Sequence, residues 1–242
     1  MTIPTEEIQD YEIAIQNNLI ALSNYNRWVV STFDGQYGKR ILDIGSSIGN
    51  ITQIILDKYN PELLVSIDKN EKAVREITTR FQNRRNFKAQ RMRIDSKASI
   101  NLRRHKFDTI TCFNVLEHIE DDHKALENMR KILMPKGRLI LLVPAIQSIY
   151  GNFDKSAGHF RRYEKNELEN KVKSAGFKVE SIRFFDIAGI ITWFLYGRII
   201  KPGTYPKRSE LTAIDYLVPL CSKIEDSIKP PIGLSLACSC TK

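Results

Sequence analysis

The chain has 242 residues, of which 42% are hydrophobic and 27% are charged. These proportions fit one α/β domain that is large enough to bury a substantial core. Residues 1–7 lack the basic start and apolar run of a signal peptide, and no apolar stretch approaches the ~20 residues needed to span a bilayer. We therefore expect a cytoplasmic protein rather than a secreted or membrane-spanning one.

The formal net charge is +9, from 37 Lys and Arg against 28 Asp and Glu. The densest basic runs cover residues 80–93 and 103–106. We expect both runs to lie on solvated connections away from the binding crevice. No nucleic-acid-binding motif accompanies them, so nucleic acid is not an expected partner. RNA, or transient contact with an anionic membrane surface, remains the alternative use of this charge.

The four cysteines are Cys112, Cys221, Cys238 and Cys240. Their spacing is neither that of a zinc site nor that of a disulfide framework. We expect reduced structural thiols and no bound metal.

Residues 1–39 precede the first expected strand. Apolar residues spaced along positions 8–22 predict an amphipathic helix, which we expect to end near residues 23–28.

Residues 40–52 read as a buried strand, a turn and the start of a helix. Ile41, Leu42 and Ile44 form the nearly continuous apolar run of a parallel strand covered on both faces. Gly45 and Gly49 bracket a turn where the backbone approaches a neighbour closely. The free N–H groups of the following helix face that turn. Alone, such a turn indicates either a nucleotide-like ligand or a tight structural turn.

Polar residues follow the next three expected strands. Asp68 ends the strand at 63–67, Asp95 follows residues 87–94, and Asn114 follows residues 107–113. The carboxyl ends of parallel strands form the binding crevice of a doubly wound sheet, so these residues should share one site. An acid in the place of Asp68 can accept hydrogen bonds from both hydroxyls of a ribose.

Helices are expected at 70–80, 121–133 and 164–175, with further strands at 138–143 and 177–185. This alternation predicts right-handed crossovers and a parallel sheet. Residues 187–200 are apolar on all sides, which favours burial as the roof of a substrate pocket; a dimer face or a membrane contact is the alternative. A helix at 211–227 and a last strand at 234–241 follow.

The chain resembles the class I S-adenosylmethionine (SAM)-dependent methyltransferases of the bacterial small-molecule type. The resemblance is carried by Leu-Asp-Ile-Gly-x-x-x-Gly, by Asp68, by Ile94-Asp95, by Phe107-Asp-x-Ile, by the segment 115–122 (VLEHIEDD) and by the segment 133–144 (LMPKGRLILLVP). Ser47 departs from the glycine that the family usually has at that position. It places a Cβ in the turn and puts cofactor affinity in question.

The resemblance implies a Rossmann-like, doubly wound sheet of seven strands with the last strand antiparallel. It further implies one domain over residues 1–242: a helical lid at 1–39, a SAM-binding core at 40–144, and a substrate loop, helical insertion and last strands at 145–242. The cofactor-binding residues implied by the family pattern are Tyr25, Trp28, Asp43, Gly45, Ser46, Gly49, Asp68, Lys69, Asp95, Ser96 and Asn114. Structural alternatives stay open: a turn cap for Asp43, a helix cap for Asp95, and simple packing for Tyr25 and Trp28.

Residues 145–163 leave the fifth strand at the crevice and are long for a connection, which suggests a functional loop. We expect Tyr150, His159, Arg161, Arg162 and Tyr163 to face the substrate. His159 is the candidate base, because its unperturbed pKa lets it accept a proton at neutral pH, and the two arginines suit a carboxylate or phosphate. Alternatively, the loop is ordered by Arg and Tyr side chains that tie it to the body.

The sequence therefore predicts SAM-dependent methyl transfer to a small, amphipathic or anionic acceptor, by a monomer or homodimer, with S-adenosylhomocysteine as product. The acceptor atom stays open between O, N and C. A SAM-binding partner without catalysis, or an RNA-associated methyltransferase, is the runner-up. A nicotinamide-dependent dehydrogenase is disfavoured because the second glycine of Gly-x-Gly-x-x-Gly is missing.

Overall fold

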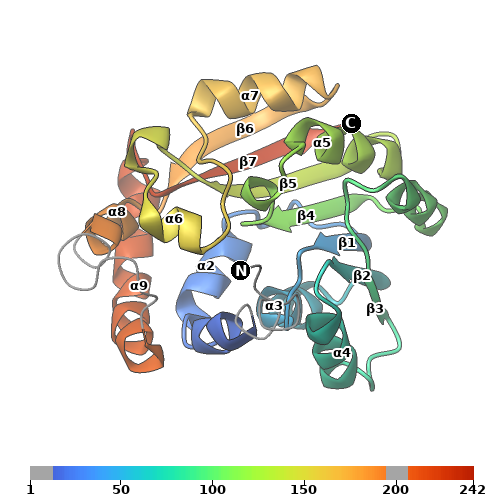
Figure 1. Ribbon diagram of the computed structural model, residues 1–242, viewed down its shortest axis with the longest axis horizontal. Coiled ribbons are helices and arrows are strands. Elements are labelled where there is room, and N and C mark those ends of the chain that lie inside the picture. Colours follow the sequence, from blue (N-terminus) through green and yellow to red (C-terminus); the bar gives the residue numbers. More distant parts are fainter. Residues whose placement is uncertain (1–12, 195–206) are drawn as a thin grey trace, which may run out of the picture.

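A computed structural model describes residues 13–194 and 207–242. Within these ranges the chain forms one seven-stranded sheet in the order β3-β2-β1-β4-β5-β7-β6 (Figure 1). β7 runs antiparallel to β5 and β6, and the other neighbouring pairs are parallel. This confirms the predicted fold class. The strands are β1 Arg40–Ile44, β2 Leu63–Asp68, β3 Phe87–Arg91, β4 Thr109–Phe113, β5 Arg138–Pro144, β6 Lys178–Phe185 and β7 Ser235–Thr241.

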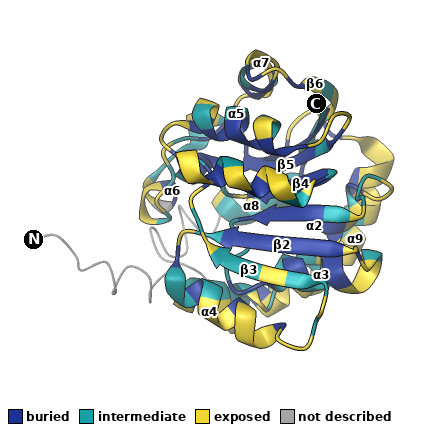
Figure 2. Cartoon of the chain, turned by 90° about the vertical axis from the view of Figure 1, so that its right-hand side faces the viewer, coloured by how far each residue is buried: buried dark blue, intermediate teal, exposed yellow. Residues whose placement is uncertain are grey.

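The two faces of the sheet carry separate apolar cores. Successive strand side chains point to opposite faces, so Ile41 joins one core while Leu42 and Ile44 join the other. Both faces are covered by helices, and the central strands are buried along their length (Figure 2). The long helices are α2 Ser23–Ser31, α3 Asn50–Tyr59, α4 Glu71–Arg80, α5 Asp122–Ile132, α7 Lys165–Ser174, α8 Ile187–Phe194 and α9 Arg208–Ile228, with the 3-10 helix η1 at Lys97–His105.

The N-terminal region differs from the expectation of one helix ending near residues 23–28. A helix over residues 13–19 ends in a turn, and α2 then begins at Ser23. The carboxylate of Asp215 in α9 accepts hydrogen bonds from the backbone N–H groups of Asn24 and Tyr25, each at 2.9 Å. This cap comes from the other end of the chain, so local sequence does not reveal it. Residues 1–12 of the expected lid lie outside the described ranges.

The segment after β5 is also more ordered than the predicted loop. It forms the 3-10 helix η3 Gln147–Ile149 and the short helix α6 Asn152–Ser156, and returns to the sheet through a bridge between Ala145 and Tyr163.

The described part of the apolar segment expected to roof the substrate pocket is less buried than expected. This part is α8, where Ile191 is 64% exposed and Phe194 51% exposed. Residues 195–200 lie outside the described ranges. In α9, Tyr216, Leu217, Leu220, Ile224 and Ile228 also face outward. Of the helices in the described ranges, none has the length and apolarity to cross a membrane.

Candidate functional site

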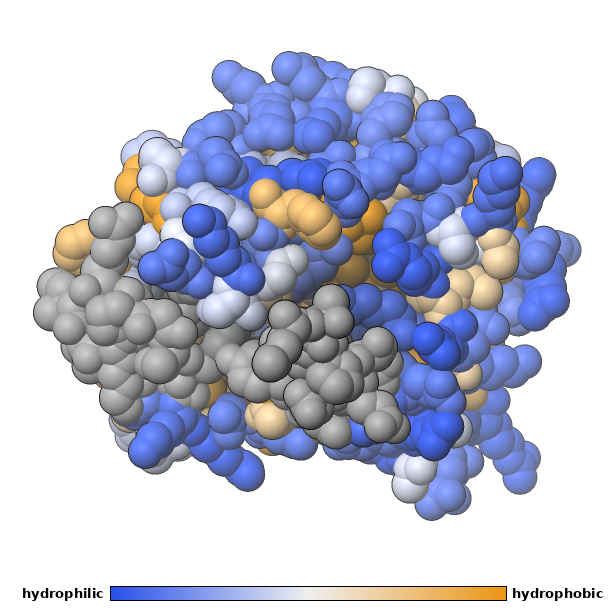
Figure 3. All heavy atoms as spheres, viewed as in Figure 1, coloured by the Kyte–Doolittle hydropathy of each residue, from blue (hydrophilic) through white to orange (hydrophobic). Residues whose placement is uncertain are grey.

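A cavity of about 500 Å³ lies at the carboxyl ends of the parallel strands, within the roughly 300 to 1,000 Å³ common for small-molecule sites. Figure 3 shows a hollow with apolar residues in the middle of this face, surrounded by hydrophilic residues. The lining includes Gly45 and Ser47 after β1, Asp68 and Lys69 at β2, Arg93 and Asp95 after β3, Asn114, Glu117 and His118 after β4, and His159 after α6. The topology therefore brings the predicted strand ends to one site.

The turn after β1 has left-handed backbone at Gly45 (φ 70°), Ser47 (φ 47°) and Gly49 (φ 86°). A Cβ on Gly45 would collide with Val115, and a Cβ on Gly49 would come 2.7 Å from the Phe81 ring. Only Gly45 and Ser47 of these three line the cavity. Gly49 instead lets α3 approach α4 closely, which is the structural reason for its glycine.

Asp68 closes β2 with its carboxylate at the cavity. Oδ2 accepts a hydrogen bond from the Ser47 backbone N–H at 2.9 Å, and Oδ1 accepts one from the Asn70 N–H at 2.8 Å. A carboxylate has about four lone-pair positions. A carboxylate at the cavity is a group that can accept hydrogen bonds from hydroxyls.

Asp43 lies beneath the turn rather than on the cavity. Its side chain is buried and accepts hydrogen bonds from the hydroxyls of Thr52 at 2.6 Å and Thr111 at 2.8 Å. Burial raises the pKa of Asp43 to about 6, against the two hydroxyl donors, which lower it. This carboxyl ties β1, α3 and β4 together and supports the turn from below.

Asp95 lines the cavity, where its carboxylate pairs with the guanidinium of Arg93. Arg93 donates to Asp95 from Nη2 at 2.7 Å and from Nε at 3.1 Å, and both side chains are at the cavity. Arg93 belongs to the basic run expected to lie away from the crevice. Ser96 is not part of the lining; its hydroxyl donates to the Arg93 carbonyl at 2.7 Å.

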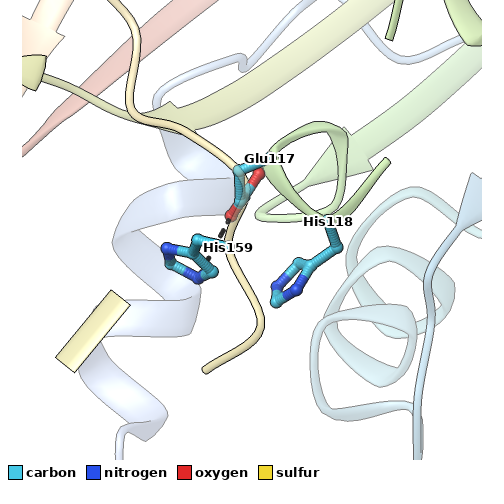
Figure 4. A group of neighbouring side chains, drawn as sticks. All are labelled: Glu117, His118 and His159. Atoms are coloured by element: carbon cyan, nitrogen blue, oxygen red, sulfur yellow. Dashed lines mark ion pairs between the residues drawn. The ribbon is translucent and has the colours of Figure 1, made fainter. Parts of the chain in front are cut away.

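Three side chains from distant positions meet at the other part of the cavity. Glu117 and His118 belong to the 3-10 helix η2 Leu116–His118, and His159 comes from the segment after α6 (Figure 4). Nε2 of His159 lies 4.0 Å from Oε1 of Glu117, and the two imidazole rings are nearly perpendicular, with centroids 4.6 Å apart. Glu117 is fully buried.

The surroundings of these groups set their protonation. Burial raises the pKa of Glu117 to about 7, and nearby His159 partly opposes that shift. Burial also lowers the pKa of His118 to about 3, so this imidazole is neutral at physiological pH. Nδ1 of His159 lies 3.1 Å from Oδ1 of Asp154, and Nδ1 of His118 lies 3.3 Å from the Gly158 carbonyl.

Comparison with known proteins decides the family. Residues 19–182 match the family model described as a methyltransferase domain, which is more than half of the chain. The chain belongs to this family. It is a SAM-dependent methyltransferase, as the resemblance implied.

Two curated relatives and one solved structure illustrate the likeness. The uncharacterized methyltransferase YcgJ of Bacillus subtilis is 23% identical over 197 residues, covering 78% of this chain and 75% of that protein. The ubiquinone biosynthesis O-methyltransferase of Coxiella burnetii is 22% identical over 173 residues, covering 63% and 67%. A SAM-dependent methyltransferase from Mesorhizobium loti superposes with a TM-score of 0.60 at 12% identity, covering 88% of this chain and 95% of that one. At that identity the structural likeness shows the fold alone.

The predicted arginine clamp of the methyltransferase is corrected by the structure. Nε of Arg162 lies 2.8 Å from Asp154, and the side chain is only 3% exposed. Nη1 of Arg161 lies 2.8 Å from Asp122, whose carboxylate also accepts from the Tyr163 hydroxyl at 3.0 Å. The charges of both arginines are neutralised within the protein, and neither lines the cavity.

Tyr150 and Tyr163 also serve the loop itself. The Tyr150 hydroxyl donates to the His159 carbonyl at 2.7 Å, and Tyr163 is fully buried. Neither tyrosine lines the cavity. The alternative that Arg and Tyr side chains tie this loop to the body describes the structure, and His159 is the one predicted substrate residue at the cavity.

Tyr25 and Trp28 of the methyltransferase pack together with Phe185 rather than at the cavity. The ring centroids of Trp28 and Phe185 are 4.2 Å apart, and those of Tyr25 and Phe185 are 5.9 Å apart. The N-terminal residues at the cavity are Ile15, Gln16 and Leu19. Ser46 also lies outside the lining, with its hydroxyl buried.

Glu117 was the main residue that sequence reasoning missed. It stands in the segment 115–122 that carried the family resemblance, but no role was given to it. Two cues were available: an acid inside an otherwise apolar strand-end segment, and an adjacent histidine. Neither cue shows that His159, 42 positions later, approaches the same carboxylate.

Proposed function

We propose that this methyltransferase binds SAM along the strand ends of the cavity and transfers its methyl group to a hydroxyl of a small amphipathic acceptor beside His159. The observation that carries the proposal is that one cavity joins the Asp68 carboxylate to the group of Glu117, His118 and His159. The first is suited to a ribose and the second to a hydroxyl that must lose its proton.

The residues present fit the cofactor. The close approach of Gly45 to Val115 leaves no room for a side chain at position 45, so the backbone of that residue can face the ligand. We assign Asp68 to the ribose, Asp95 and Lys69 to the adenine side, and Gly45 with Asn114 to the methionine part. Asp43 acts from beneath, by holding the turn.

When bound, SAM supplies an electrophilic methyl group on a sulfonium, which a nucleophile displaces in line. The protein's task is then to position the acceptor and to take its proton. Nδ1–H of His159 donates to Asp154, and this tautomer leaves a lone pair on Nε2. Nε2 accepts the hydroxyl proton as the acceptor oxygen bonds to the methyl carbon and the sulfur–carbon bond breaks.

Apolar residues in the cavity lining, such as Met92, Ile119 and Pro144, support an acceptor with an apolar body. An anionic group on the acceptor has lost its main support, because Arg161 and Arg162 are paired inside the protein. The relative named as an O-methyltransferase of ubiquinone biosynthesis favours oxygen as the acceptor atom.

The test is incubation of metabolite extracts with labelled SAM, followed by kinetics on the labelled product. His159→Ala should lower turnover by roughly 10²- to 10⁴-fold, the usual contribution of a general base, while SAM affinity stays unchanged. Arg161 pairs with Asp122 in α5 and does not line the cavity. Arg161→Ala should therefore leave the Michaelis constant for the acceptor unchanged. SAM binding without methyl transfer to any extract, or transfer to RNA alone, would favour the runner-up functions.

A further inference from the structure

We propose that Glu117, His118 and His159 form a binding site for one divalent transition-metal ion of the Zn²⁺ type. The inference rests on the proposed function only where it places the acceptor beside the ion. It departs from the expectation of no metal, which was drawn from the cysteines and did not consider histidine with glutamate.

The donor set and its spacing fit such an ion. Each residue offers one ligand atom, and these three atoms lie within 4.8 Å of one another. Zinc binds histidine nitrogen and carboxylate oxygen at about 2.0 to 2.2 Å, so ligand atoms on one ion lie about 3 to 4 Å apart. The side chains therefore need to approach by about 1 Å. The rings of His118 and His159 already point toward the same space as the Glu117 carboxylate (Figure 4).

The outer nitrogens of both imidazoles have the partners that metal-bound histidines usually have. Nδ1 of His159 contacts the Asp154 carboxylate, and Nδ1 of His118 contacts the Gly158 carbonyl. These contacts leave Nε2 of each ring for the ion and fix the ring orientation. Asp154 is itself held by Arg162 and by the Gly151 N–H at 3.0 Å.

The buried carboxylate of Glu117 is the feature that points to a bound cation. Both of its carboxylate oxygens are buried and lack a hydrogen-bond partner among the described residues. A buried carboxylate without a partner is costly, and a bound cation removes that cost.

Three protein ligands leave the ion open toward the cavity, as in catalytic rather than structural zinc sites. An acceptor hydroxyl can bind in an open position, where the ion lowers its pKa. With the ion bound, Nε2 of His159 is a ligand and no longer the base. The ion then lowers the pKa of the bound hydroxyl, whose proton passes to water in the cavity before the oxygen takes the methyl group. Two nitrogen ligands disfavour Mg²⁺, which prefers oxygen.

The experiment uses tag-free, chelator-treated protein titrated with ZnCl₂ by calorimetry and with CoCl₂ by visible absorption. We expect one ion per chain for both metals and no competition by millimolar MgCl₂. Glu117→Gln and His159→Ala should each weaken affinity at least tenfold. Asp154→Asn should weaken it 10- to 100-fold through the His159 ring. The control is His123→Ala, since His123 lies on the exposed side of α5, 3.6 Å from Glu127.

Glu117→Gln keeps the side-chain shape and removes a buried charge, so it should remain folded. Its melting temperature should not rise with Zn²⁺, whereas that of the parent protein should. Absence of zinc binding by the parent protein, or zinc affinity in both Glu117→Gln and His159→Ala equal to that of the parent, would overturn the site. A parallel SAM titration separates the two proposals: SAM binding without zinc binding removes only the metal, whereas loss of SAM binding in the parent removes the proposed function.

Discussion

The backbone N–H of Ser47 donates a hydrogen bond to the Asp68 carboxylate, 2.9 Å away. This contact joins the turn after β1 to the end of β2. The two strands are parallel neighbours, with Ile44 paired to Ile67, so their carboxyl ends are held in register. The glycine turn and the carboxylate proposed to hold the ribose are therefore one structural unit.

Replacing Asp68 should weaken SAM binding. Asp68→Ala removes the acceptor assigned to the ribose, which should cost about 1 to 3 kcal/mol, or roughly 5- to 150-fold in the dissociation constant. Calorimetric titration with SAM measures this. The control is Glu62→Ala. Glu62 is an exposed acid that directly precedes Leu63, the first residue of β2, at the other end of the strand from Asp68. An unchanged dissociation constant in folded Asp68→Ala would show that the cofactor is misplaced.

Ser47 should tolerate glycine but not a β-branched residue. Its φ of 47° is in the left-handed region, which costs side chains with a Cβ about 1 to 2 kcal/mol. Ser47→Gly relieves this cost and should therefore not lower the stability of the parent. It should also keep SAM affinity, because the donor to Asp68 is the backbone. Ser47→Val should lower the free energy of unfolding by roughly 1 to 2 kcal/mol. Urea denaturation measures the free energy of unfolding of each variant. Equal values for Ser47→Gly and Ser47→Val would show that the backbone at this position is not strained.

Asp43 should make stability depend on pH. Its folded-state pKa is about 6, above the ordinary 3.8, because burial disfavours the charged form. The folded state therefore holds this proton to higher pH than the unfolded chain. The contribution to stability is full below about pH 4 and is lost as the pH rises through about 6.

Asp43→Asn cannot titrate and keeps a group that can bond both threonine hydroxyls. The difference in unfolding free energy between parent and variant should shift by about 1 to 3 kcal/mol between pH 4 and pH 7, in favour of the variant at the higher pH. Denaturation curves at several pH values measure the shift. Parallel curves for the two proteins would refute it.

Asp215 should stabilise the protein by capping α2. Its buried carboxylate satisfies two backbone N–H groups at the start of that helix, those of Asn24 and Tyr25. Asp215→Ala should lower the free energy of unfolding by about 2 kcal/mol. Asp226→Ala is the matched control, because Asp226 is exposed on the same helix and should change stability by less than about 0.5 kcal/mol. Equal losses in the two variants would mean that the cap is unimportant.

The parallel core of the fold, and the meeting of several strand-end residues at one cavity, followed from the sequence alone. The apolar runs at β1, β2 and β4 are long enough to identify buried strands. Gly45 follows β1, Asp68 ends β2 and Asn114 follows β4. Because parallel strands align their carboxyl ends, Gly45, Asp68, Asp95 and Asn114 had to meet at one edge of the sheet. That inference needs only the common direction of the strands, which the alternation of strands and helices predicts.

The partners of the charged side chains were decided only by the tertiary structure. Arg161 and Arg162 read as a clamp for an anion because spacing along the chain does not tell whether a guanidinium faces the cavity or an internal carboxylate. Asp122 and Asp154 meet these arginines through the packing of α5 and α6 against the loop. In the same way, Asp215 reaches α2 across 190 residues, and Glu117 meets His159 only because the segment after β5 folds back over the end of β4. Such contacts arise from the docking of whole elements, whose geometry depends on the packed core and not on any local pattern.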